Sequence, residues 1–435
     1  MKVILLIVPL LFSITAYCQQ NKLRNEISIA ANKIEAQVIA WRRDIHEHPE
    51  LGNNEIRTSG IVAKYLASLG IEVTTGVAKT GVVGILKGGK PGPVIALRAD
   101  MDALPITERT PVPFASKVKT MYNGQEVGVM HACGHDSHVA MLLGVATVLS
   151  SMKKDLKGTV KFIFQPAEEG PPPGETGGAE VMVQDGVMDN PKVDVVFGMH
   201  INSKLEVGKI SYHPGGTMAA VNDMRIVIRG KPSHGAYPWS SIDPIVTAAE
   251  IINNLQTVVS RNLNVTENAG VVTMGSVQGG NRPNVIPDSV VMLGTIRSLS
   301  PDDEKMMVER VKQIITKTAE ANGATAEIAL PWTSHYPVTF NNVALTEKML
   351  PSLRKTAGDS NVVLKPATTG AEDFSFYQLK APGLFIFLGG MPKGEDPKNA
   401  PAHHTPDFYI DESGFKLGVE AMANLTVDYM NIATK

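Results

Sequence analysis

Residues 94–105, with the sequence VIALRADMDALP, join a short apolar run to a cluster of charged residues. The run Val94–Leu97 has the length and composition of a strand that is buried on both faces. Asp100 and Asp102 follow it within five residues. In open α/β sheets, binding and catalytic sites are built at the carboxyl ends of the strands. The stretch therefore predicts a buried strand with a functional edge.

The same kind of apolar run recurs further along the chain, at Val160–Phe164, Val193–Phe197 and Leu384–Leu388. Between the runs lie stretches such as Val139–Ser151, which is rich in Ala, Leu and Met and favours a helix. Buried strands that alternate with helices predict a layered α/β domain around a largely parallel sheet.

The segment from His213 to Pro331 has a different pattern, and we expect it to form a second domain. The predicted order is β-α-β-β-α-β, which is the ferredoxin-like α+β arrangement. This domain, residues 213–331, is inserted into the α/β domain, which comprises residues 19–212 and 332–435. The elements expected in it are strands Asp223–Arg229, Gly270–Val277, Asp288–Ile296 and Ala324–Leu330, and helices Asp243–Ser260 and Asp302–Ala321.

Composition excludes several other classes of protein. The 435 residues are 43% hydrophobic and 19% charged, which is enough apolar material for cores of ordinary size and too much for a disordered chain. The net charge is −2 and no Lys/Arg-rich run is present, so we expect no nucleic-acid partner. Only two cysteines occur, Cys18 and Cys133.

The N-terminus predicts an export signal. Lys2 precedes the apolar run Val3–Phe12, which is too short to span a bilayer, and small residues follow up to Ala16. We expect a signal peptide over residues 1–18, cleaved after Cys18, and therefore a periplasmic or secreted protein without a membrane span. A lipid-modified Cys18 and a buried N-terminal helix are the alternatives.

Five polar clusters lie just after the predicted strands of the α/β domain or in the loops that follow them. They contain thiol, imidazole and carboxylate groups, which are the ligands that Zn²⁺, Mn²⁺, Co²⁺ and Ni²⁺ take from proteins. Cys133 and His135 lie two residues apart at the start of a helix, where both can face one metal ion. The clusters are Asp100–Asp102, His131–His138, Glu168-Glu169, His200 and His403-His404.

Glu168 and Glu169 suggest a division of roles. One carboxylate can bind a metal ion while its neighbour holds the attacking water as a general base. The alternatives are a solvated acidic pair for the two glutamates and an ordinary core residue for Cys133. We favour the metal site because Cys133 lies among His131, His135 and Asp136.

Other motifs carry less weight. Gly84–Lys90 nearly matches a phosphate-binding loop, but Pro91 replaces the required Ser or Thr. No G-x-S-x-G motif is present, which argues against a serine hydrolase. We interpret His46, His48, His213 and His335 as structural residues.

Taken together, the motifs resemble the metal-dependent peptidase and amidohydrolase family of aminoacylases, hippurate hydrolases and indole-acetyl-amino-acid hydrolases. The resemblance runs from about Ile34 to Tyr429 and is greatest for the N-acyl-amino-acid amidohydrolase branch. The matching stretches are Arg43–Leu51, Leu97–Pro105, His131–His138, Phe164–Gly170, Ser233–Ala236, Asn284–Pro287, Gly370–Phe374 and His403–Pro406.

The resemblance implies two divalent metal ions, Zn²⁺ or Mn²⁺, with Co²⁺ and Ni²⁺ also suitable. Cys133 would bridge the ions, Glu168 would be the general base, and Asp100 and Asp102 would orient the ligands. His404 is chosen over His403 because it directly precedes Thr405-Pro406. The other implied ligands are His135, Glu169, His200 and His404.

The resemblance also assigns the inserted domain the role of a lid and of a homodimer contact. His234 and Asn284 would contact the substrate, with His234 stabilising the oxyanion, and Arg297 is a candidate clamp for a carboxylate. The implied reaction is hydrolysis of the amide bond of an N-acyl-L-amino acid, a small-molecule substrate. The alternatives are a dipeptidase or carboxypeptidase with the same two-metal chemistry, and a metal-dependent binding protein without catalysis.

Overall fold

The computed structural model describes residues 7–333 and 335–433, and it divides into two compact units. Unit 1 comprises the chain up to Gly215, Asn341–Lys365 and the chain from Phe376 onward. Unit 2 comprises Gly216–Phe340 and Pro366–Ser375. The predicted boundaries at residues 213 and 331 concern which parts of the chain fold independently, and they stay a prediction.

Unit 1 is built on an eight-stranded mixed sheet in the order β1-β2-β6-β3-β7-β19-β8-β18. The neighbours β6, β3, β7 and β19 run parallel, and each contains or overlaps one of the apolar runs predicted as strands. Their bounds are β3 (Lys90–Asp100), β6 (Lys157–Gln165), β7 (Val195–Glu206) and β19 (Gly383–Met391).

The outer strands make the sheet mixed, which the apolar pattern did not predict. Strands β1 (Glu72–Val77) and β2 (Gly81–Lys87) are antiparallel to their neighbours on one side. On the other side β8 (Ile210–Tyr212) is antiparallel to β19, and β18 (Val362–Leu364) is parallel to β8. Gly84 interrupts the apolar run of β2, and a Cβ there would lie 3.0 Å from Ile71 Cγ2 and from Leu66 Cδ1. Close packing therefore explains why a glycine interrupts the apolar run of β2.

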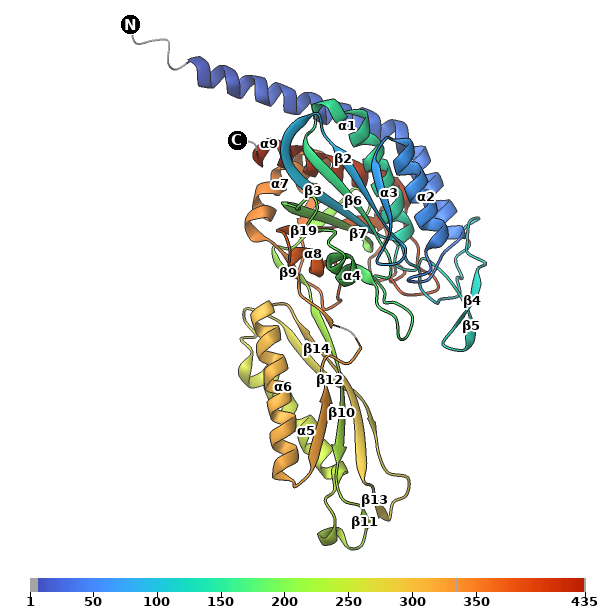
Figure 1. The fold of residues 1–435 in the computed structure, drawn as a ribbon, viewed down its shortest axis with the longest axis vertical. Helices are drawn as coiled ribbons and strands as arrows, with labels where there is room; N and C mark the ends of the chain where they lie inside the picture. The colour runs from blue at the N-terminus through green and yellow to red at the C-terminus, as the bar shows by residue number, and fades with distance from the viewer. Residues whose placement is uncertain (1–6, 334, 434–435) are drawn as a thin grey trace. The chain divides into compact units, whose positions relative to one another are not determined.

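Helices α1 (Ile7–Glu47), α3 (His135–Ser151) and α9 (Phe415–Ala433) pack together on one face of this sheet (Figure 1). Alternate strand residues such as Leu97, Phe162 and Phe197 are fully buried in the same core. Burial of each such side chain contributes about 1.5–3 kcal/mol. The other helices of unit 1 are α2 (Ile56–Ser68), α4 (Gly178–Gln184) and α7 (Val343–Ala357).

Unit 2 has the predicted β-α-β-β-α-β order. Its main sheet runs β12-β14-β10-β15, and Met224, Ile226 and Ile228 of β10 are buried in its core. The side chains of Asp243 and Ser300 cap α5 and α6 by accepting hydrogen bonds from the first-turn N–H groups. The bounds are β10 (Ala220–Arg229), α5 (Pro244–Thr257), β12 (Gly270–Gln278), β14 (Ser289–Ser298), α6 (Pro301–Ala321) and β15 (Thr325–Ala329).

Short elements complete the fold. They are strands β4 (Lys119–Tyr122), β5 (Gln125–Gly128), β9 (Gly215–Met218), β11 (Ser233–His234), β13 (Val285–Ile286), β16 (His335–Tyr336) and β17 (Thr339–Asn341), the helix α8 (Ser375–Gln378), and the turns η2 (Lys153–Asp155), η3 (Pro238–Ser240), η4 (Val258–Asn262), η5 (Asp359–Asn361) and η6 (Glu412–Gly414).

The N-terminal segment lies partly outside the described residues, which begin at residue 7. Residues 7–18 of the predicted signal peptide form the first turns of α1. In the described part of the chain, no helix is both long enough and apolar enough to span a membrane. Cleavage of the segment stays a prediction.

Two helical glycines test the packing of unit 1. A Cβ at Gly144 of α3 would lie 2.8 Å from Val38 Cγ2 and 2.9 Å from Val419 Cγ2, whereas a Cβ at Gly60 of α2 would meet nothing within 4 Å. We expect Gly60→Ala to stabilise the protein by about 0.5–1 kcal/mol through helix propensity. Gly144→Ala should destabilise it, because overpacking costs about 1–3 kcal/mol. Thermal unfolding of both variants measures this; a raised Tm for Gly144→Ala would contradict the packing.

Candidate metal centre

The predicted ligands of unit 1 lie together at the carboxyl edge of the parallel strands. Asp100 ends β3, Glu168 and Glu169 follow β6, and His200 lies in β7. Cys133 and His135 lie at the start of α3, where Gly134 has a left-handed φ of 96°. A Cβ at Gly134 would lie 2.3 Å from Ile201 Cγ2, so this turn requires glycine.

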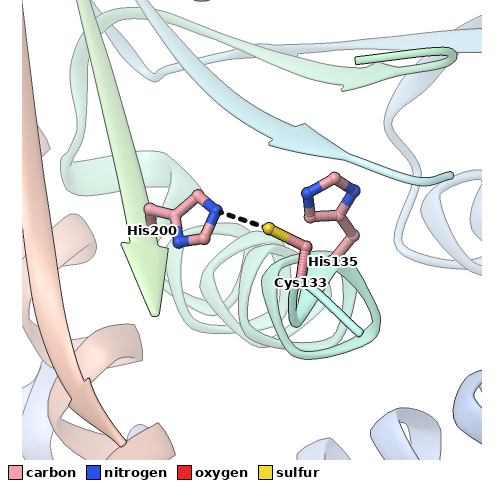
Figure 2. A group of neighbouring side chains, drawn as sticks. All are labelled: Cys133, His135 and His200. Carbon is pink, nitrogen blue, oxygen red and sulfur yellow. Dashed lines mark hydrogen bonds between the residues drawn. The ribbon is translucent and has the colours of Figure 1, made fainter. Parts of the chain in front are cut away.

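Cys133 is the centre of the cluster. Its Sγ lies 3.4 Å from His200 Nε2 and 3.3 Å from His404 Nε2. Figure 2 shows His200 and His135 on either side of the sulfur. Among the described residues, potential ligand atoms lie within 4.8 Å of one another in five groups, and two of these contain Cys133: Cys133–His135–His200 and Cys133–Glu169–His404. These two groups have only the thiol in common, which is the arrangement that a bridging ligand requires, and a third group, His135–Glu168–Glu169, places Glu168 beside both of them.

The imidazoles of His135 and His200 are oriented by the backbone. Nδ1 of His135 donates to the carbonyl of Asp102 at 2.9 Å, and Nδ1 of His200 donates to the carbonyl of Ile201 at 2.6 Å. Nε2 of His135 is buried and has no hydrogen-bond partner among the described residues. Metal-binding histidines typically donate their second N–H in this way, which leaves the other nitrogen as a ligand. The orphaned nitrogen therefore fits a metal ion.

His403 and His404 differ in how their ring nitrogens are used. Nε2 of His403 accepts from the N–H of Ser203 at 3.1 Å, and its Nδ1 donates to the carbonyl of Cys133 at 3.2 Å. His403 therefore has no nitrogen left for a metal. Nε2 of His404 faces Cys133 Sγ and lies 2.9 Å from Glu169 Oε1. The geometry favours His404 as the ligand.

The two aspartates support the ligands from behind. Asp100 accepts from His138 Nδ1 at 2.6 Å and from Arg98 Nη1 at 2.6 Å. Burial opposes ionisation of Asp100, but His135, Arg98 and His138 hold its pKa well below the usual range. Asp102 accepts from the N–H of Glu169 at 2.9 Å and thereby links the two ligand groups.

His138 supports the metal ligands, a role that was not predicted from the sequence. Its Nε2 accepts from the N–H of Ile201 at 2.8 Å, so both ring nitrogens are hydrogen-bonded. His138 therefore positions its neighbours and does not bind a metal ion. The spacing of three from His135 places both on one helix face and is the signal that could have identified it.

The charges of the cluster favour a bound cation. Burial lowers the pKa of His135, but Asp100, Asp102 and Glu169 outweigh it and raise that pKa to about 10. Burial, together with Glu169 and Glu168, raises the pKa of the Cys133 thiol well above its ordinary value. Metal ligation deprotonates a thiol and replaces the protons that otherwise balance the carboxylates. The sulfur, nitrogen and oxygen donors together fit a divalent transition metal.

A buried ionic network ties α1 to the helix that carries Cys133 and His135. Asp136 Oδ2 lies 2.8 Å from Arg42 Nε and 2.8 Å from His46 Nδ1. His46 Nε2 lies 3.1 Å from Glu108 Oε1. The structural interpretation of His46 fits these contacts, and they give the Arg43–Leu51 stretch a role in holding the site rather than in chemistry.

The remaining predicted residues lie in unit 2. His234 of β11 pairs with Val285 of β13, and the carbonyl of Asn284 accepts from the N–H of Gly235 at 2.8 Å, so His234 and Asn284 are neighbours. Arg297 lies near the far end of β14, opposite Val221 and Val271. It lies eight positions beyond Ser289, the start of that strand, which is about 26 Å at ~3.3 Å per residue. Within one unit 2, Arg297 is therefore not grouped with His234 and Asn284.

The two adjacent histidines allow a matched test of the centre. We expect His404→Ala and Cys133→Ser to weaken binding of Zn²⁺ or Mn²⁺ at least about tenfold, because each removes a donor. His403→Ala should lose less affinity, since it removes only hydrogen bonds. Competition with a chromogenic chelator measures the affinities. Equal losses for the two histidine variants would contradict the assignment.

Comparison with known proteins places this centre in a family. Residues 96–428 match Peptidase family M20/M25/M40. The chain is 40% identical over 412 residues to thermostable carboxypeptidase 2 of Saccharolobus solfataricus, covering 94% of this chain and 99% of that one. It is 38% identical over 400 residues to an N-acetylcysteine deacetylase of Bacillus subtilis, covering 92% and 98%.

A solved structure from Bacillus subtilis, described as a dinuclear metal binding peptidase of the M20 family, agrees with a TM-score of 0.75. It is 36% identical and the match covers 92% of this chain and 99% of that one. The match to the family runs through every candidate ligand from Cys133 to His404. The chain is a metal-binding hydrolase of amide bonds and belongs to Peptidase family M20/M25/M40.

Proposed function

We propose that this protein hydrolyses the amide bond of N-acyl-L-amino acids and releases a carboxylic acid and a free amino acid. The observation that carries the proposal is the pair of ligand groups that share Cys133, with the buried Glu168 beside them. The 38% identity to an N-acetylcysteine deacetylase over nearly its whole length supports this substrate class.

The proposed centre holds two divalent metal ions, Zn²⁺ or Mn²⁺, with Cys133 as the bridging ligand. His135 and His200 complete one group, and Glu169 and His404 complete the other. Co²⁺ and Ni²⁺ suit the same donors. The dinuclear description of the similar solved structure supports two ions.

Bound divalent ions polarise the carbonyl of the scissile amide and acidify water. Glu168 is the residue placed to move the proton. It is only 7% exposed, and its Oε2 lies 3.8 Å from His135 Nε2, so the carboxylate borders the ligands without belonging to either Cys133 group. In the proposed reaction Glu168 takes a proton from the attacking water and then delivers it to the leaving nitrogen.

Unit 2 supplies the lid in this proposal. His234 and Asn284 contact the substrate carbonyl, and His234 stabilises the oxyanion. Both residues lie together on the β11–β13 pair, which supports a joint role. Arg297 is proposed as a carboxylate clamp and unit 2 as the contact of a homodimer. Arg297 lies far from the β13 end of β14, so we propose that it acts together with His234 across two subunits.

Replacement of the general base tests the mechanism. We expect Glu168→Gln to lower kcat for an N-acetyl-amino acid at least about 100-fold, because general acid–base catalysis is worth that much or more. Metal content should stay at the wild-type level, since the amide leaves both Cys133 groups intact. Steady-state kinetics and elemental analysis measure the two. Wild-type turnover in a fully metallated variant would refute the role of Glu168.

The second candidate function is hydrolysis of dipeptides or of a C-terminal residue, which the 40% identity to a thermostable carboxypeptidase favours. The same centre serves both reactions, because both cleave an amide beside a carboxylate. A panel of acyl-amino acids and dipeptides with the same C-terminal residue separates them by kcat/KM.

We further propose that the protein is exported through residues 1–18. The basic start and the short apolar run support this. Expression of the full chain in a bacterium with N-terminal sequencing of the product should give a chain that begins at Gln19. A lipid on Cys18, detected by mass, would support anchoring, and an intact Met1 would contradict export.

A further inference from the structure

The carboxylate of Glu55 is buried in unit 1, outside the candidate ligand groups. Glu55 directly precedes α2. Its Oε1 accepts from the N–H of Ala167 at 2.8 Å, and its Oε2 accepts from the hydroxyl of Thr80. Burial, together with the charge of Asp102, raises the pKa of Glu55 to about 7. Because a buried carboxylate is costly, the hydrogen bonds that it makes indicate a role.

Capping of α2 is not that role. Among the described residues, the side chain of Glu55 accepts no hydrogen bond from the first turn of this helix. The carboxylate of Glu50 caps the helix instead, because its two oxygens accept from the N–H groups of Arg57 and Thr58 at 2.8 and 2.9 Å. The side chain of Glu55 is turned toward Ala167, in the segment that carries the two glutamates of the metal centre.

Ala167 has an unusual backbone conformation at the start of a turn. Its φ of 50° lies in the left-handed region, which residues other than glycine rarely adopt and which persists only where the surroundings impose it. The carbonyl of Ala167 accepts from the N–H of Gly170 at 3.3 Å, so Glu168 and Glu169 are the central residues of the turn. The direction of both carboxylates therefore depends on the conformation of Ala167.

Two buried carboxylates hold the residues on either side of Glu168. Glu55 accepts from the N–H of Ala167, and Oδ2 of Asp102 accepts from the N–H of Glu169 at 2.9 Å. Hydrogen bonds to an ionised carboxylate are stronger than those between neutral groups. Glu55 directly precedes α2, which packs in the core of unit 1. The turn is thus tied to the core at both sides of the proposed general base.

We propose that Glu55 is a positioning residue for catalysis, which holds the N–H of Ala167 and thereby fixes the turn that directs Glu168 toward the substrate. The inference rests on the proposed role of Glu168 as the general base and adds the residue that sets the direction of its carboxylate. Without this hydrogen bond Ala167 can leave the left-handed region, and Glu168 then turns away from the scissile amide. A misplacement of about 1 Å can lower turnover about 100-fold.

Three substitutions separate the hydrogen bond from the charge. Glu55→Gln keeps the length and an oxygen for the N–H of Ala167, so kcat should stay within about threefold of the wild type, since the bond is neutral and somewhat weaker. Glu55→Asp keeps the charge but is one CH₂ group too short, and Glu55→Ala has no acceptor, so both should lower kcat at least about tenfold. KM should stay within about twofold, because the loss concerns the transition state. Steady-state kinetics with the best substrate of the acyl-amino-acid and dipeptide panel measures these values.

Ser59→Ala is the matched control. The hydroxyl of Ser59, on α2, donates to the carbonyl of Thr80 at 2.6 Å, so the variant loses a hydrogen bond close to Glu55 without altering the turn. It should keep the wild-type kcat.

Hydrogen exchange of the metal-loaded proteins reports on the turn directly. In Glu55→Asp and Glu55→Ala the amides of residues 167–170 should exchange at least about tenfold faster than in the wild type, because local opening costs less. In Glu55→Gln and in the control they should exchange at the wild-type rate.

The outcomes separate this role from the proposed function. Wild-type kcat and exchange in Glu55→Asp and Glu55→Ala would overturn the positioning role and leave the function standing. Full activity of Glu55→Asp beside an inactive Glu55→Gln would assign the effect to charge and contradict the proposal as well. A metallated wild-type enzyme that hydrolyses nothing in the panel would overturn the function, while the exchange rates still decide whether Glu55 holds the turn. If Glu55→Ala does not fold, Glu55→Asp remains the test.

Discussion

The metal centre depends on one constraint: His135 and His200 each donate one ring N–H to a backbone carbonyl. The carbonyls of Asp102 and Ile201 fix the Nδ1 atoms of His135 and His200, which leaves Nε2 of His200 facing the Cys133 sulfur and Nε2 of His135 free to bind a metal ion in the same group. The carbonyls belong to the chain beyond β3 and to β7, so the sheet itself sets the ligand geometry. Rigid supporting elements are what keep metal ligands in productive positions.

A second set of interactions keeps the charges behind the ligands paired. Asp100 is held between Arg98 and His138, and Asp136 between Arg42 and His46. Removal of one partner from such a buried pair costs about 3–5 kcal/mol, because it leaves an uncompensated charge. The two networks therefore stabilise the fold and the ligand positions together, and α1 takes part through its last turns even though it supplies no ligand.

Much of the fold could be predicted because its strands and helices carry strong local patterns. Four apolar runs, the first starting at Val94 and the last ending at Leu388, predict the parallel strands. The Ser300-Pro301 pair predicts the start of α6. The mixed character of the sheet could not be predicted, because Gly84 weakens the apolar pattern of β2 for a packing reason that only the tertiary structure reveals. The pattern of a strand records its burial and says little about its direction.

The candidate site was predictable in composition but not in detail. The donor types of Cys133, His135 and Glu169 indicate a metal without any structure, whereas the difference between His403 and His404 lies in their hydrogen bonds and not in their residue type. Arg297 shows the converse: its charge suits a carboxylate, yet its position on β14 separates it from His234.

The division between ligands and cavity wall explains how one centre can serve different substrates. Cys133 and His135 lie at the start of α3 and His200 lies within β7, and the positions of both elements are fixed by the core. A cavity of about 670 Å³ beside Glu169 is lined by the β4–β5 hairpin and the loop after Glu169, and also by residues of the stretches 49–54 and 103–105. Substitutions in such peripheral segments change cavity size without moving the ligands, because few core contacts depend on them.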